Sequence, residues 1–64
     1  MNAIREHRTQ RKWTQAELAE RLGVERSTVA KWESGASQPQ AAHLIALAEI
    51  FECTVDALLK RERK

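Results

Sequence analysis

Hydrophobic residues recur along this chain at the spacing of helix faces. Between the turn signals, which lie at Gly23, at residues 34–39 and at residues 53–54, they return every three or four positions. Residues that favour helices (Ala, Leu, Glu, Arg, Gln and Lys) dominate these stretches, and no run alternates between hydrophobic and polar residues as a strand does. The pattern predicts an all-α domain, a compact bundle of five short helices.

The second helix has a start and an end that the sequence specifies. Thr14 and Glu17 have the spacing of a capping box, in which each side chain pairs with a free backbone N–H of the other residue. Trp13 and Leu18 can pack together as a hydrophobic staple across this start, and Gly23 stands where a left-handed residue ends a helix. One apolar face then consists of Leu18, Ala19 and Leu22.

The third helix, expected over about residues 26–34, has two unlike faces. Val29 and Trp32, with Glu33 beside them, share the side that must pack inward. The opposite side has the small or cationic residues Ser27, Lys31 and Ser34, and Arg26 and Ala30 flank them. Small outward residues allow the backbone of this helix to approach another surface closely. Together with the preceding helix and its glycine turn, this is the pattern of a helix-turn-helix unit.

The remaining helices are assigned from the same spacing. The first extends from about Asn2 to Arg11 and has Ile4 as its single large apolar residue. The fourth extends from about Gln40 to Phe51, and its inward residues are expected to be Ala41, Leu44, Ile45, Leu47, Ala48 and Phe51. Thr54 can cap a fifth helix that contains Val55, Leu58 and Leu59.

The length limits what the chain can do. With 64 residues it forms one domain, which we assign to residues 1–59, followed by a basic tail at 60–64. A core this small leaves no room for a catalytic cleft, so we expect no enzymatic activity and no small-molecule substrate. Cys53, His7 and His43 do not form a zinc pattern, and we expect no metal or cofactor. The longest apolar run, 44–48, is too short to cross a membrane, which favours a cytoplasmic protein.

The net charge of +2 is unevenly distributed. Residues 1–13 contain four basic residues and one acidic residue, whereas residues 35–59 contain three acidic residues and no Lys or Arg. A basic N-terminal part suits a polyanionic partner, and the acidic part is expected to face away from it.

The stretch from Gln15 to Ser34 resembles the helix-turn-helix motif of the lambda-repressor/Cro-like (XRE) family of bacterial and phage regulators. The matching positions are Leu18, Ala19, Leu22, Gly23, Val24, Val29 and Trp32, and the similarity extends from Ile4 to Leu59. The resemblance implies a lambda repressor-like fold and sequence-specific binding to double-stranded DNA, as in a small transcriptional regulator of the repressor kind. The helix at 26–34 would enter the major groove.

The resemblance also assigns roles to individual residues. The base-reading residues would be Arg26, Ser27 and Lys31, and an arginine can hold a guanine with two hydrogen bonds. The phosphate-contacting residues at the motif would be Gln15, Thr28 and Ser34. The loop at 36–38 lacks the basic residues that often hold the DNA backbone in the family, and the basic residues Arg5, Arg11 and Lys12 are expected to supply part of that phosphate contact. In the plainer interpretation, these are solvated polar residues on exposed helix faces.

Two further expectations concern structure and assembly. In the family an arginine of the first helix pairs with the acid that ends the third, and Arg8 and Glu33 occupy these positions. A homodimer is expected, with an interface formed by Ile50, Ala57, Leu58 and Leu59. The alternative is that these residues only close the core of a single chain, and Leu58 fits this alternative best. The sequence departs from the family at Glu25, where a Ser or Thr cap is usual, and at Lys12 and Glu52, where glycine is expected.

A second class of function stays open. The same fold serves in antitoxins and adaptors, which would bind a partner protein through the acidic side of the fourth and fifth helices. Salt dependence separates the two classes, because binding to DNA releases counterions from phosphates and weakens steeply with salt.

Overall fold

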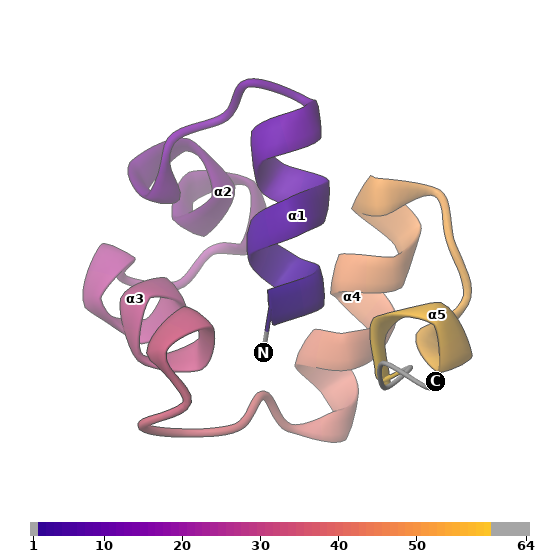
Figure 1. Cartoon of the computed structure of the whole chain (residues 1–64). Coiled ribbons are helices and arrows are strands. Elements are labelled where there is room, and N and C mark those ends of the chain that lie inside the picture. The colour runs from indigo at the N-terminus through magenta and orange to yellow at the C-terminus, as the bar shows by residue number, and fades with distance from the viewer. Residues whose placement is uncertain (1, 60–64) are drawn as a thin grey trace.

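Five helices form the part of the chain that the structure describes. The computed structural model describes the backbone of residues 2–59 and the side chains of residues 3–58. The helices are α1 (Asn2–Gln10), α2 (Gln15–Leu22), α3 (Arg26–Ser34), α4 (Ala41–Phe51) and α5 (Val55–Leu59). In Figure 1, α1 stands between α2 and α3 on one side and α4 and α5 on the other. The predicted all-α class and helix order are confirmed, and the tail at 60–64 lies outside the described residues.

Two helices begin with the side-chain caps that the sequence predicts. At α2, the Glu17 N–H donates to Thr14 Oγ1 at 3.0 Å, and the Thr14 N–H donates to Glu17 Oε1 at 2.8 Å. At α5, the Ala57 N–H donates to Thr54 Oγ1 at 3.0 Å. Glu25 and Gln40, which precede α3 and α4, provide no side-chain cap. The capping box therefore fixes the start of α2, the first helix of the motif.

Three helices end in the same backbone turn, in which a left-handed residue closes a Schellman motif. The left-handed residues are Lys12, Gly23 and Glu52, with φ angles of 62°, 74° and 58°. In each turn the next N–H reaches back to a carbonyl five residues earlier, at distances of 2.9–3.1 Å: Trp13 to Arg8, Val24 to Ala19 and Cys53 to Ala48. A lysine and a glutamate thus stand where the sequence predicts glycine.

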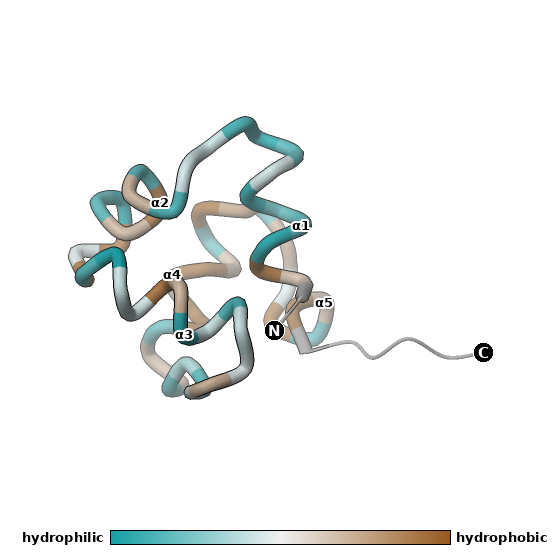
Figure 2. Tube along the Cα trace, turned by 60° about the vertical axis from the view of Figure 1, so that its left-hand side comes forward, coloured by the Kyte–Doolittle hydropathy of each residue, from teal (hydrophilic) through white to brown (hydrophobic). Residues whose placement is uncertain are grey.

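The core forms where α1, α2, α3 and α4 meet, and it is closed by α5. The predicted inward side of α3 is confirmed, because Val29 and Trp32 are buried. The other buried hydrophobic residues are Ile4, Leu18, Ala19, Leu47, Ala48, Phe51 and Leu58. Figure 2 shows α4 as mostly hydrophobic along its length, α1 as mostly hydrophilic, and α2, α3 and α5 with both kinds of residue.

Two residues expected on the inward side of α4 are exposed. The first is Ala41, at the start of the helix. The second, Ile45, was expected in the core, but it is 55% exposed, because the inward row of α4 is centred on Leu47. Leu58 has the core role that the sequence offered as the alternative to a dimer contact, since it is 1% exposed within the single chain and belongs to the core cluster. Leu58 therefore contributes to the core and cannot offer a free surface to a second copy.

Candidate nucleic-acid interface

The outward face of α3 has the three residues expected to read DNA bases. Arg26, Ser27 and Lys31 are exposed. Ser27 and Lys31 lie on the side of the helix opposite the buried Val29 and Trp32, and Arg26 flanks that side. None of the three side chains makes a hydrogen bond or an ion pair with residues 3–58. The described chain therefore leaves this polar, cationic face free to approach another molecule.

The packing of α2 against α3 holds this face in position. Leu18 and Ala19 of α2 are buried in the same cluster as Val29 and Trp32 of α3. Ala19 has the small side chain needed where the two helices come close, and Gly23 (φ 74°) makes the turn between them. The inward residues are thus fixed, and the outward residues keep a constant orientation.

The start of α2 has donors available for an anion. The capping box occupies the N–H groups of Thr14 and Glu17, and the Leu18 N–H donates to the Thr14 carbonyl at 3.0 Å. Within residues 3–58, the N–H groups of Gln15 and Ala16 have no acceptor. Backbone N–H groups and the positive end of the helix dipole favour a phosphate at such a position.

The two phosphate contacts expected on α3, Thr28 and Ser34, differ in whether their hydroxyl groups are free to bind a ligand. Thr28 is partly exposed and makes no side-chain hydrogen bond to residues 3–58. Ser34 is exposed, but its hydroxyl donates to the Lys31 carbonyl at 3.2 Å and accepts the Ala36 N–H at 3.3 Å. Ser34 therefore also stabilises the turn that ends α3.

Arg11 has a structural role that the sequence did not indicate. Its guanidinium donates to the His7 carbonyl at 3.1 Å and to the Phe51 carbonyl, which joins the ends of α1 and α4. It also lies 5.2 Å from the centroid of the Phe51 ring and 5.9 Å from that of Trp13. Lys12, by contrast, is exposed in the turn between α1 and α2.

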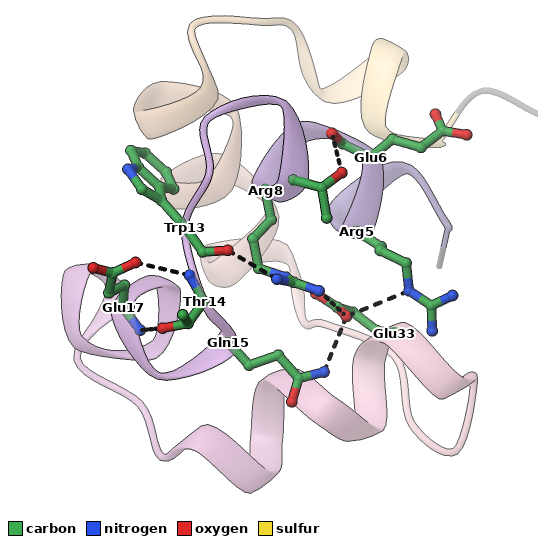
Figure 3. A network of polar contacts seen from close by, with 9 residues as sticks. Arg5, Glu6, Arg8, Trp13, Thr14, Gln15, Glu17 and Glu33 are labelled. Atoms are coloured by element: carbon green, nitrogen blue, oxygen red, sulfur yellow. Dashed lines mark hydrogen bonds and ion pairs between the residues drawn. The ribbon is translucent and has the colours of Figure 1, made fainter.

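The expected pair of Arg8 and Glu33 is present, and it belongs to a larger network (Figure 3). Arg8 donates from Nε to Glu33 Oε2 at 2.7 Å and from Nη2 to Oε1 at 3.0 Å, a bidentate pair. Arg8 also donates to the Trp13 carbonyl at 2.8 Å. Gln15 Nε2 donates to Glu33 Oε1 at 3.0 Å, and Arg5 Nε lies 3.6 Å from the same oxygen. Glu33 thus joins the start of α2 and two residues of α1 to the end of α3.

These contacts keep the Glu33 carboxylate charged. Burial raises the pKa of Glu33, but hydrogen bonds from Arg8 and Gln15 and the positive charges of Arg8 and Arg5 outweigh burial, so its pKa lies below the ordinary value. The Glu33 hydrogen bond also raises the pKa of Arg8, against the effect of burial. Both groups are therefore ionised at neutral pH.

The sequence did not indicate the contacts of Gln15, Arg5 and Arg21. Gln15 and Arg5 meet Glu33 across 18 and 28 residues of chain, and helical spacing within one element cannot reveal such contacts. The Arg21 guanidinium lies over the Trp13 ring, 4.1 Å from its centroid. Trp13 in turn stacks on Phe51, which explains its packing role.

The residues expected at a dimer interface are only partly available. Ile50 and Ala57 are half-buried, Leu58 is in the core, and the side chain of Leu59 lies outside the described residues. Among the described side chains, Ile45 is the large hydrophobic residue with the most exposed surface.

Neither a metal cluster nor a membrane span is found in the described part of the chain. Between residues 2 and 59, no three His, Cys, Asp or Glu side chains gather as ligands for a metal ion. No helix of this region combines the length and the apolar character that a membrane span needs.

The model of one protein family, described as helix-turn-helix, matches residues 4–58. The chain belongs to this family. Its lambda repressor-like type is shown by the crystal structure of the phage P22 c2 repressor in complex with a synthetic operator, which is 33% identical. That structure superimposes with a TM-score of 0.87 over 95% of this chain and 92% of the repressor chain.

Two bacterial relatives of this helix-turn-helix chain are named as transcriptional regulators. The activator BcrR of Enterococcus faecalis is 39% identical over 92% of the chain, and the regulator AnsR of Bacillus subtilis is 36% identical over all of it. The chain spans 29% of the length of BcrR and 55% of that of AnsR. The match therefore covers only part of the length of each relative.

Proposed function

We propose that the chain binds double-stranded DNA sequence-specifically and acts as a transcriptional regulator of the repressor kind. The observation that carries this proposal is the exposed, cationic face of α3, held outward by the buried Val29 and Trp32. The similar P22 c2 repressor was crystallised with an operator, which supports the same type of ligand here. The function is one of binding, without catalysis, and the compartment that goes with it is the cytoplasm.

In this proposal the outward residues divide the work. Arg26, Ser27 and Lys31 contact base edges in the major groove, and Arg26 holds a guanine through two hydrogen bonds. The free N–H groups at the start of α2, with Gln15, bind a phosphate. Thr28, Ser34 and Lys12 make further phosphate contacts. Arg11 is not included among the phosphate contacts, because its guanidinium donates to the carbonyls of His7 and Phe51 and lies over the Phe51 ring.

A homodimer completes the proposal. One reading helix covers only a few base pairs, so two copies would bind half-sites about 34 Å apart along the duplex. Of the expected interface residues, Ile50 and Ala57 have surface available for this contact.

Selection of bound sequences from a random duplex library tests the proposal. The wild type should enrich one half-site, repeated with two-fold symmetry. Arg26→Ala should relax the preference at one position of that half-site, with a loss of discrimination of about 1–3 kcal/mol. No enrichment, together with salt-resistant binding to a protein, would favour the antitoxin or adaptor function instead.

A further inference from the structure

The Glu33 network contains one more positive charge than is needed to neutralise the carboxylate. Arg8 already gives the carboxylate two hydrogen bonds, at 2.7 and 3.0 Å, and so neutralises its charge. Arg5 adds a second guanidinium, with its Nε 3.6 Å from Oε1. One carboxylate thus faces two arginines, and the cluster keeps a net charge of +1 next to the start of α2.

The surplus charge is on the solvent side. The side chain of Arg5 is 57% exposed, whereas those of Arg8 and Glu33 are 13% and 1% exposed. Arg5 turns only its Nε toward Glu33, and its two terminal nitrogens make no hydrogen bond to residues 3–58. These nitrogens form a fork that matches the oxygens of a phosphate.

Gln15 and Arg5 reach the same carboxylate oxygen from different helices. Figure 3 shows Gln15 approaching Glu33 from α2 and Arg5 approaching it from α1. Their nitrogens lie 3.0 and 3.6 Å from Glu33 Oε1, so the amide and the guanidinium are neighbours in space. The free N–H groups at the start of α2 belong to the same region, because Gln15 is the first residue of that helix.

We propose that Arg5 is a DNA phosphate contact, and that the buried Glu33 acts as the positioning residue that holds Arg5 and Gln15 side by side against the DNA backbone. This inference rests on the proposed function and adds to it a residue of α1. The 3.6 Å contact between Arg5 Nε and Glu33 Oε1 orients the Arg5 side chain and leaves its terminal nitrogens available to another anion. A phosphate then accepts from the terminal nitrogens, while Glu33 stays paired with Arg8.

Titration of a labelled duplex at several salt concentrations tests the inference. The probe is a mixed-sequence duplex of about 20 base pairs, two helical turns, followed by fluorescence anisotropy. For each bound copy of the chain, Arg5→Ala should reduce the slope of log K against log salt by about 0.9 and weaken binding about tenfold at 50 mM salt, equally for all sequences. Arg5→Lys should restore part of the slope.

Arg21→Ala is the matched control, since it removes the same charge from an exposed arginine whose guanidinium lies on Trp13. It should keep the wild-type slope. If Arg5→Ala keeps that slope too, the inference is wrong while the proposed function stands. If the wild type binds no duplex at any salt concentration, both are wrong. Thermal unfolding of Arg5→Ala should match that of the wild type, because Arg8 maintains the pair with Glu33.

A double-mutant cycle tests the positioning role of Glu33 separately. In a Glu33→Gln background, Arg5→Ala should cost less affinity than it does in the wild type, because Arg5 is no longer held. An equal cost in both backgrounds would remove Glu33 from the inference. Should Glu33→Gln fail to fold, the NMR signal of the Arg5 Nε–H in the wild type provides the second measurement. The signal should shift when the duplex is added at low salt, and an unchanged signal counts against the contact.

Discussion

Replacing Lys12 and Glu52 by glycine, one at a time, tests the origin of helix-end stability in this chain. Both residues have left-handed backbones, with φ angles of 62° and 58°. This conformation costs a residue with a Cβ about 1–2 kcal/mol, and glycine avoids the cost. Glycine also gains about 0.4–1 kcal/mol of conformational entropy in the unfolded chain, which offsets part of the benefit. The backbone alone therefore predicts a net gain of about 0.5–1 kcal/mol at either position.

The charges make the two substitutions unequal. The C-terminal end of a helix is partially negative, so Glu52 is unfavourable after α4, whereas Lys12 is favourable after α1. Each charge effect is about 0.3–1 kcal/mol at an exposed site. We expect Glu52→Gly to stabilise the chain by about 1 kcal/mol or more, which raises Tm by about 4–8 °C in a domain of this size. Lys12→Gly should give less than half of this gain.

Urea unfolding followed by the fluorescence of Trp13 and Trp32 measures both effects. Glu52→Ala is the control, because it removes the charge and keeps the Cβ, so it should recover only the electrostatic part. Equal stabilisation by alanine and glycine would refute the argument from the left-handed backbone. A duplex titration adds a second comparison: Lys12→Gly should weaken DNA binding although it stabilises the fold, while Glu52→Gly should leave binding unchanged.

Two further predictions concern the interior. Glu33→Gln should destabilise the chain by about 3 kcal/mol, because it leaves the guanidinium of Arg8 without its counter-charge. The pKa of Glu33 is lower in the folded chain than its ordinary value of 4.5, so its contribution is complete above that pH and is lost as the pH falls through the folded pKa. The wild type should therefore lose more stability in acid than Glu33→Gln does, and parallel acid unfolding curves would contradict this. Leu58→Ala should cost about 2–5 kcal/mol in urea unfolding, whereas a surface role at a dimer contact predicts a change below about 0.5 kcal/mol.

The elements of the fold were predictable because their signals are local. Thr14 and Glu17 define the start of α2 within four residues, and the spacing of Val29 and Trp32 fixes which side of α3 faces inward. The outward side that holds Arg26 follows directly, since a helix has only one other side. The sequence alone therefore predicts the part of the site that lies on α3.

The remaining features depend on contacts between distant elements. Helical spacing predicts an apolar side of α4 that includes Ile45, and only the packing of α1, α2 and α5 against this helix decides that Leu47 lies at its centre. Leu58 looks the same in sequence whether it packs inward or meets a second copy. Arg11 has the charge of a phosphate contact, but the end of α4, forty residues away, engages it. Periodicity cannot indicate which distant carbonyl a guanidinium will meet.

The separation of the two sides of α3 has a consequence for how new binding preferences arise. The side chains of Arg26, Ser27 and Lys31 make no hydrogen bond or ion pair with residues 3–58, so exchanging any of them should shift the unfolding free energy by less than about 0.5 kcal/mol. Variants with other residues at these three positions should therefore keep almost the full stability of the fold. In evolution or in a randomised library, the preferred operator can therefore change through single substitutions on this face, and no stabilising substitution in the core is needed to compensate.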